Sequence, residues 1–533
     1  MNKVKFILLY LLFIISRLFF INTKHIFFDS DEYLNLFSYP NYFSAIISGH
    51  APPHEGYIIL FWPVFHLAQF LHIDPAYTVI VLQILLACLI MYCFYQIVVF
   101  LSDKRTALIA SVIASLTPLF WIINVTIMME IAYITFFFLS LYLLTKYLKK
   151  SSNVSLHVSS FFFTLAFLTH PMTVIWLPFY LAIVWVKNKK KLLMSTVTIA
   201  GYLTVFILVN TLFLALVSKE NFLPVFHHLY LTKGHEIAYL PMNITGFLIA
   251  MRNFLLPLLR NNTSLIVILG FVSLIILFIK NKKLFLLSFL WIAPALYANQ
   301  WWDSLLNGRH AVIAGFGFAF IVAYLLKRKK LLTISMIIYL LIVSLPALNL
   351  LRQPIPYIQE AHFVKTLPKD SLLIETHFAK PQVEKTFQGK LLAVNDPLSG
   401  RDEIGKEIDS YLSQKKPIFI SSGALSEPYG LYSGPYLHNI TLSYTNPFQL
   451  TPLIKKYTLK KYQTLSSEDN LIIYQIISDK PAPYPEVKHL RDSYRRLDYY
   501  DPLWRIWALL KKWVNFFIYE RNCFCSIKST TSP

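Results

Sequence analysis

Three carboxylates stand within four residues near the start of the chain, in the stretch Phe28-Asp29-Ser30-Asp31-Glu32-Tyr33. Carboxylates at this density can act as a general base, bind a metal ion, or do both. The alternative is a solvated loop that ends a helix. Asp31, Asp29 and Glu32 are therefore the candidate catalytic residues, and the sequence leaves open which aspartate takes a proton.

A base that activates an acceptor hydroxyl needs a partner that stabilises the leaving group. If that group is a lipid-linked phosphate, the partner is a cation or a metal ion. Arg309 and His310 directly precede a hydrophobic segment, which places a guanidinium at headgroup depth. An interfacial anchor made of Trp and Arg is the alternative interpretation.

Further polar residues that could bind substrate are His54, Glu55 and Tyr57, which follow Pro52-Pro53, and Glu130, which opens a hydrophobic segment. The alternatives are a proline-stiffened helix start and a charge that is favourable at a helix N-terminus. The histidines at positions 227, 228 and 235 match no compact zinc motif. A divalent metal ion is one option, and the sequence assigns no other cofactor.

Composition predicts the class. Of 533 residues, 56% are hydrophobic and only 14% are charged, which indicates a polytopic α-helical membrane protein. The formal charge of +21 comes from lysines in short loops between apolar runs, as the positive-inside rule predicts, and does not indicate a nucleic-acid partner. The four cysteines suggest no disulfide framework.

The positions of the basic residues predict the topology. Five basic clusters all lie on the cytoplasmic side if the chain has about eleven transmembrane helices. The clusters are Lys104-Arg105, Lys146 to Lys150, Lys187 to Lys191, Lys280 to Lys283 and Lys327 to Lys330. The predicted spans are residues 6–22, 77–100, 107–125, 130–147, 155–170, 172–186, 194–217, 264–280, 284–299, 311–326 and 331–349.

This topology has three consequences. The first segment is a retained signal anchor, interrupted by Arg17. The apolar stretches 57–73 and 245–259 lie on the outer face without crossing. The acidic stretch, Glu130 and Arg309 then all face outward, at a cell membrane that the chain crosses many times.

After Leu350 the composition changes. Apolar runs predict strands at 371–376, 390–394, 417–421 and 471–477, and amphipathic runs predict helices at 357–366 and 402–413. The predicted domains are a membrane domain at 1–350, a small extracytoplasmic α/β domain at 351–485 and a basic aromatic amphipathic tail at 486–533. No glycine-rich phosphate loop follows a strand.

The arrangement resembles the glycosyltransferase C superfamily, in particular bacterial relatives of protein O-mannosyltransferases and lipid A aminoarabinose transferases. Asp31-Glu32-Tyr33 stands where the family has its acidic motif, at the start of the first outer loop. Pro52-Pro53-His54-Glu55-Gly56-Tyr57 resembles, in altered order, the family's His-Pro-Pro surface helix. Gly308-Arg309-His310 resembles its Arg-Tyr before a late span, with His310 in place of the tyrosine.

The resemblance implies transfer of a sugar from a polyprenyl-phosphate-linked donor to a lipid, glycan or protein acceptor on the outer side, with inversion at the anomeric carbon. It implies Asp31 or Asp29 as the base, Glu32 as its neighbour and Arg309 as the ligand of the donor phosphate. Two other functions stay open: a transporter or flippase of lipid-linked glycans, and a membrane-anchored envelope assembly protein. The apolar span centres disfavour the transporter.

Overall fold

The computed structural model describes residues 3–23, 28–48, 54–219, 221–226, 263–295, 312–351, 356–376, 379–394, 401–426, 453–466 and 471–483. Two compact units emerge, the first built mainly from Glu32–Leu348 and the second mainly from Asn349–Arg496. Arg309, His310, the surface stretch 245–259, the histidines at 227, 228 and 235 and the tail 486–533 lie outside the described residues.

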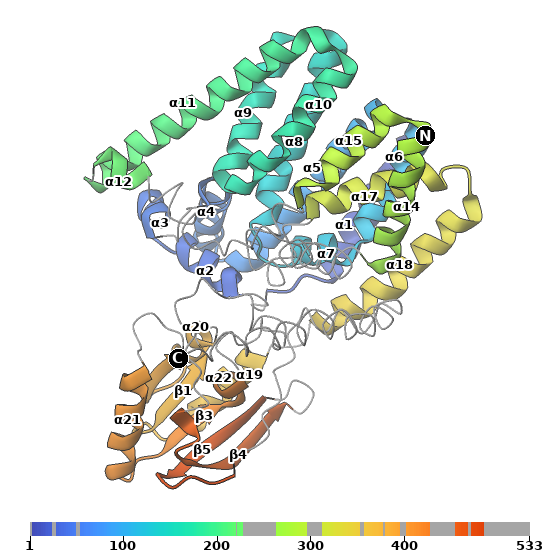
Figure 1. Cartoon of the computed structure of the whole chain (residues 1–533). Coiled ribbons are helices and arrows are strands. Elements are labelled where there is room, and N and C mark those ends of the chain that lie inside the picture. Colours follow the sequence, from blue (N-terminus) through green and yellow to red (C-terminus); the bar gives the residue numbers. More distant parts are fainter. Residues whose placement is uncertain are drawn as a thin grey trace, which may run out of the picture. The chain divides into compact units, whose positions relative to one another are not determined.

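The first unit is helical throughout its described part (Figure 1). Its helices, with α18 running to Leu351, are α1 (Lys3–Phe19), α2 (Phe28–Phe37), α3 (Tyr42–Ser48), α4 (Glu55–Phe70), α5 (Pro75–Leu101), α6 (Lys104–Leu116), α7 (Pro118–Val125), α8 (Glu130–Lys150), α9 (Asn153–Thr169), η1 (Pro171–Trp176), α10 (Leu177–Lys187), η2 (Lys189–Lys191), α11 (Leu192–Ser218), α12 (Phe222–Phe226), α14 (Ser264–Lys280), α15 (Lys282–Ile292), α17 (Val312–Leu326) and α18 (Lys330–Leu351).

Every predicted span overlaps at least one of these helices. By length and composition, three helical stretches in the described part can cross a membrane: Pro75–Leu101, Glu130–Lys150 and Lys189–Ser218. The pair α6 and α7 makes a fourth if it is one bent span, and further apolar helices have 10–17 residues. A membrane protein is therefore supported, while the count of about eleven spans stays a prediction.

The predicted span at residues 107–125 consists of two helices, α6 and α7, with a break between them. α6 and α7 meet at an angle of 63°. Pro118 is the first residue of α7, and Thr117 before it is extended, with φ −63° and ψ 136°. A proline disfavours helical backbone in the preceding residue, and its missing N–H is tolerated at a helix start.

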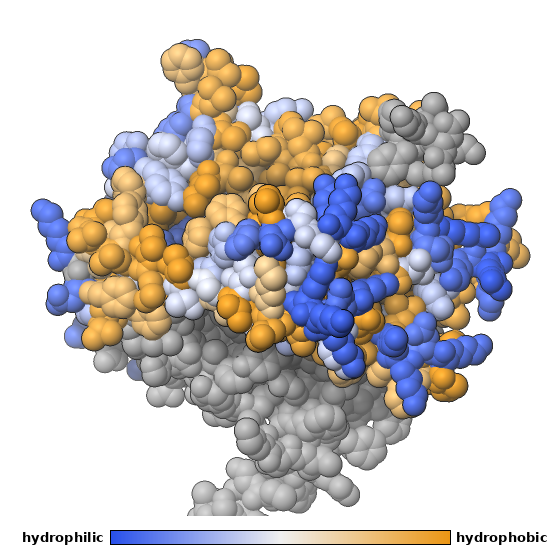
Figure 2. All heavy atoms as spheres, turned by 90° about the horizontal axis from the view of Figure 1, so that it is seen from above, coloured by the Kyte–Doolittle hydropathy of each residue, from blue (hydrophilic) through white to orange (hydrophobic). Residues whose placement is uncertain are grey.

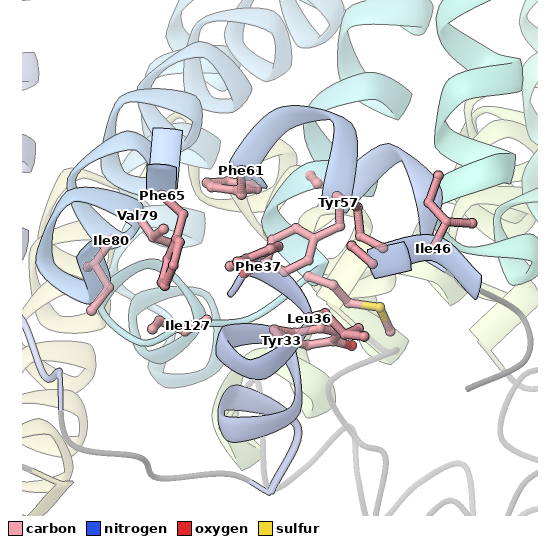
Figure 3. Packing of buried hydrophobic residues seen from close by; sticks show 14 of the residues in the cluster. Tyr33, Leu36, Phe37, Ile46, Tyr57, Phe61, Phe65, Val79, Ile80 and Ile127 are labelled. Atoms are coloured by element: carbon pink, nitrogen blue, oxygen red, sulfur yellow. The ribbon is translucent and has the colours of Figure 1, made fainter. Parts of the chain in front are cut away.

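The acidic stretch lies in helix α2. Tyr33, Leu36 and Phe37 form the buried face of this helix, because residues three and four apart share one side. In Figure 3 the three side chains point toward Tyr57 and Phe61 of α4. The ring centroids of Tyr33 and Tyr57 are 4.8 Å apart. This packing fixes α2, from Tyr33 onward, against the start of α4.

The lysine-rich turns meet at one end of the bundle, the upper end in Figure 1. Lys187 donates to the main-chain oxygen of Phe100 at 3.1 Å, and Lys149 also lies over the Phe100 ring. Lys327 pairs with Asp103 at 3.1 Å. Figure 2 views the bundle from this end and shows hydrophilic side chains gathered on that face. Four of the five predicted basic clusters therefore lie at the same end of the bundle, in turns that contact one another or are adjacent.

The second unit contains a five-stranded sheet with the order β2-β1-β3-β5-β4. The strands are β1 (Leu372–Thr376), β2 (Lys390–Val394), β3 (Ile418–Ser421), β4 (Thr458–Ser466) and β5 (Leu471–Ser478), with helices α19 (Pro356–Phe363), η6 (Val364–Thr366), α20 (Lys380–Val383), α21 (Arg401–Ser413) and α22 (Ser422–Ser426). β1 pairs in parallel with β2 and β3, and β5 runs antiparallel to β3 and β4. The four predicted strands are present, and β4 was not predicted.

Two buried carboxyl groups meet inside this unit. Glu360 of α19 and Glu375 of β1 are both 0% exposed. Burial, and then the neighbouring Glu375, raise the pKa of Glu360 well above its ordinary value. Ser421 donates to Glu375 at 2.6 Å. A retained proton allows the two carboxyl groups to be buried together.

Candidate functional site

His54 joins the start of α4 to the end of α9. Its Nδ1 lies 2.9 Å from the main-chain oxygen of Thr169, and the side chain is buried. A carbonyl oxygen can only accept, so Nδ1 carries the proton and Nε2 is the acceptor nitrogen of the neutral ring. An imidazole held in this tautomer can accept a hydrogen bond or a proton from a hydroxyl group.

Aromatic and imidazole rings surround His54. The ring of His170 stacks on it at 5.9 Å, and Tyr33 approaches edge-on at 5.9 Å. Tyr133 of α8 contacts His170 at 5.1 Å, and Tyr57 contacts Tyr33 at 4.8 Å. We call these residues, together with Glu130, the His54 cluster: Tyr33, His54, Tyr57, Glu130, Tyr133 and His170.

Glu130 lies at the first residue of α8 and is 0% exposed. The side chain of Gln83 in α5 donates to the main-chain oxygen of Met128 at 2.9 Å, which holds the segment before Glu130. Burial, and then the charge of Glu130, raise the pKa of Tyr57 well above its ordinary value. The carboxylate thus lies near the Tyr57 phenol, at the positive end of the α8 dipole.

The His54 cluster lies at the end of the bundle opposite the lysine-rich turns. Helix α8 has 21 residues and runs from Glu130 to Lys150, so its ends are about 30 Å apart. Lys149 belongs to the lysine-rich end through its contact with Phe100. The bundle therefore has a basic end and an end where acidic, imidazole and phenol groups meet.

Glu55 has a separate environment. Asn210 of α11 donates to its carboxylate at 2.7 Å, and the side chain is 5% exposed. Burial raises the pKa of Glu55 to about 7, although the bond from Asn210 lowers it. Glu55 therefore changes charge near neutral pH and links α4 to a long, mostly exposed helix.

Gly56 allows the close approach of α4 to α9. A Cβ atom at this position would lie 1.9 Å from the Thr169 hydroxyl oxygen and 3.2 Å from the main-chain oxygen of Leu165. A larger residue would displace the start of α4, and with it His54.

The predicted site residues separate into three groups. His54, Tyr57 and Glu130 come together in the His54 cluster, whereas Glu55 pairs with Asn210. Asp29, Asp31 and Glu32 lie in α2, but the structure does not describe their side chains. Arg309 and His310 lie outside the described residues. The cluster adds Tyr33, which ends the acidic stretch in the sequence, and Tyr133 and His170, which were not among the candidate site residues.

No group of three or more His, Cys, Asp or Glu side chains that could hold a metal ion occurs among the described residues.

Comparison with known proteins gives one match to a family profile. Residues 59–214 match the family profile described as dolichyl-phosphate-mannose-protein mannosyltransferase, a stretch that runs from α4 to α11 and includes Glu130, His170 and Asn210. No curated protein sequence matches the chain.

Two crystal structures of ArnT from Cupriavidus metallidurans share the fold. The one bound to undecaprenyl phosphate has a TM-score of 0.51 at 9% identity, over 90% of this chain and 99% of that one. The apo structure has a TM-score of 0.50 at 10% identity, over 90% and 100%. The oligosaccharyltransferase of Archaeoglobus fulgidus, in complex with Zn and sulfate, has a TM-score of 0.46 at 11% identity, over 81% and 65%.

The predicted resemblance to the glycosyltransferase C superfamily is confirmed. The ArnT match covers 90% of this chain and shows a shared fold over that length. The family profile begins after the acidic stretch and after Tyr57. The roles expected for those residues therefore depend only on the short motifs Asp31-Glu32-Tyr33 and Pro52-Pro53-His54-Glu55-Gly56-Tyr57.

Proposed function

We propose that this chain is a membrane glycosyltransferase that moves a sugar from a polyprenyl-phosphate-linked donor to an acceptor on the outer face of the membrane. The observation that carries the proposal is the fold shared with ArnT, together with a His54 cluster at the bundle end opposite the lysine-rich turns. The related ArnT structure is bound to undecaprenyl phosphate, which is the chemical class of carrier we propose here.

The proposed reaction is a displacement with inversion at the anomeric carbon. The carboxylate of Asp31 or Asp29 takes the proton of an acceptor hydroxyl, and the hydroxyl oxygen forms a bond to the anomeric carbon. The bond from that carbon to the phosphate oxygen breaks, and the electron pair leaves with the polyprenyl phosphate. Arg309 stabilises the negative charge on the released phosphate, with His310 beside it.

The His54 cluster is proposed to bind the sugar or the acceptor. Tyr33, Tyr57 and Tyr133 carry phenol groups and His54 an imidazole, and these are groups that hydrogen-bond to sugar hydroxyls. Glu130 lies near Tyr57 and adds a carboxylate, a hydrogen-bond acceptor, to the same group. Glu32 stands one residue before Tyr33 in α2 and is proposed to orient the base.

Single substitution of each aspartate tests the proposal. We expect Asp31→Asn or Asp29→Asn to abolish transfer from a polyprenyl-phosphate sugar, while the variant still enters the membrane and elutes as wild type in detergent. Ser38→Ala, at an exposed position just after α2, is the matched control and should keep wild-type activity. Full activity of both aspartate variants would overturn the assignment.

Orientation and the alternative functions have their own tests. Single cysteines at His66 and at Lys189 should react with an impermeant thiol reagent from opposite sides, with His66 outside. A flippase would move a labelled lipid-linked sugar across vesicles without transferring it. An assembly protein would keep its role when all three carboxylates of α2 are neutralised.

A further inference from the structure

Arg17 is the one charge that interrupts the first hydrophobic segment, and its side chain is only 2% exposed. A buried arginine within a hydrophobic helix is costly, so its partners indicate a purpose. Its guanidinium lies 3.9 Å from the centre of the Phe13 ring and donates to Ser16 at 2.9 Å. It also donates to the main-chain oxygen of Ser115. Arg17 is therefore held between its own helix and α6.

Ser115 lies in the last turn of α6, at the break before α7. The last carbonyl oxygens of a helix lack partners within the helix, and a break inside a membrane must satisfy them in another way. Ala114 accepts from the Thr117 hydroxyl at 2.8 Å, and Leu116 accepts from Ser344 of α18 at 2.7 Å. Arg17 supplies the bond to Ser115, with its positive charge at the negative end of the α6 dipole.

The same guanidinium contacts the other side of the break. It lies 4.2 Å from the centre of the Trp121 ring in α7. Around it, Phe20 packs edge-on against Trp121 at 5.7 Å, and the main-chain N–H of Asn22 donates to Val125 at 2.9 Å. One side chain thus touches both halves of the broken helix and helps to set the 63° angle between them.

The angle has a consequence at the His54 cluster. Helix α7 ends at Val125, and a short segment leads from there to Glu130. Gln83 holds Met128 in that segment at 2.9 Å. The direction of α7 therefore contributes, together with Gln83, to where Glu130 begins α8.

We propose that Arg17 is a positioning residue, which clamps the break between α6 and α7 and so places Glu130 in the His54 cluster. The catalytic consequence rests on the proposed glycosyl transfer, whereas the clamp itself does not. Arg17→Met removes the charge and both hydrogen bonds, and Arg17→Lys restores a donor to Ser115 without the planar face that lies over Trp121.

Kinetics provide the first test. We expect Arg17→Met to lower kcat by about tenfold to a hundredfold with little change in the KM for the donor, and Arg17→Lys to recover part of it. The control is Ser159→Ala, which removes buried hydrogen bonds to Ser140 and Tyr180 elsewhere in the bundle. A kcat of Arg17→Met no lower than that of Ser159→Ala would overturn the proposal.

A cross-link tests the clamp without any activity. In a full-length chain whose four cysteines are replaced by alanine, Asn22→Cys and Val125→Cys should form a disulfide readily under mild oxidation. Adding Arg17→Met should abolish or strongly slow this cross-link, and adding Ser159→Ala should not. An unchanged rate with Arg17→Met would overturn the clamp. Absence of sugar transfer in the wild type would count against the proposed function alone, and the cross-link would still decide the clamp.

Discussion

The Nδ1 atom of His54 donates to the main-chain oxygen of Thr169 over 2.9 Å and thereby caps the end of α9 with a residue 115 positions earlier in the chain. Thr169 is the last residue of α9, so its carbonyl oxygen has no partner within that helix. The same imidazole stacks on His170. One side chain therefore serves both the helix junction and the His54 cluster.

Replacing His54 in two ways separates these roles. In His54→Asn the amide can still donate to Thr169, but the position of Nε2 and the ring stack are lost. We expect this variant to fold and to lose up to about tenfold in transfer rate, the size of one lost hydrogen bond to the substrate. His54→Ala should also lose thermal stability. An Asn variant as active as wild type would leave His54 with the capping role alone.

Gly56→Ala should destabilise the junction of α4 and α9 by about 1–3 kcal/mol, the usual cost of overpacking. The reason is the 1.9 Å approach of the added Cβ atom to the Thr169 hydroxyl. Thermal unfolding in detergent measures the loss. Gly201→Ala in α11 is the control, because nothing lies within 4 Å of its Cβ position. Adding Thr169→Ala should partly rescue Gly56→Ala, and no rescue would argue against this clash.

Glu55 should make stability depend on pH. Burial raises its pKa from 4.5 to about 7, so between these values the folded chain binds more protons than the unfolded chain. This contribution is fully present below the unfolded pKa and is lost as the pH rises through about 7, with an upper bound of about 3 kcal/mol.

Glu55→Gln tests that dependence. An amide resembles the protonated acid, so the variant should be more stable than wild type at pH 8 and should show a flatter melting temperature between pH 5 and 8. Asn210→Ala removes the bond that favours the charged form and should steepen the decline. Equal slopes in wild type and Glu55→Gln would contradict the prediction.

Asp103 should act mainly as a helix cap. Its carboxylate accepts from the main-chain N–H of Thr106 at 2.9 Å and from Lys327 at 3.1 Å. Partial burial raises its pKa, but the bonds from Thr106 and Lys327 outweigh this and hold the pKa below its ordinary value.

Two variants of Asp103 divide the cap from the ion pair. Asp103→Ala should lose about 1 kcal/mol of stability, whereas Asp103→Asn retains a capping oxygen and should lose only a few tenths. The ion pair is worth little because the Asp103 side chain is 42% exposed. Equal losses in the two variants would mean that the ion pair with Lys327 dominates.

Local patterns were sufficient for the elements of the fold. Apolar runs long enough to be helices, and alternating runs after Leu350, depend on neighbouring residues, so they can be read along the chain. The break at Thr117 has the same local origin in Pro118, yet it was missed because the hydrophobic run continues across it. The strand β4 was missed because Lys460, Lys461 and Gln463 lie on a sheet edge and weaken its apolar pattern.

Patterns along the chain predict the membrane class, the lysine-rich turns and the acidic stretch, and they indicate His54, Tyr57 and Glu130 as candidate site residues. The partners of these side chains could not be predicted from the sequence: His54 contacts Thr169, and His170 and Tyr133 join the cluster. Likewise, Glu55 pairs with Asn210, and Arg17 contacts both sides of the break between α6 and α7. The reason is physical. Composition and periodicity depend on near neighbours, whereas these partners are brought together by packing between helices that are distant in the chain.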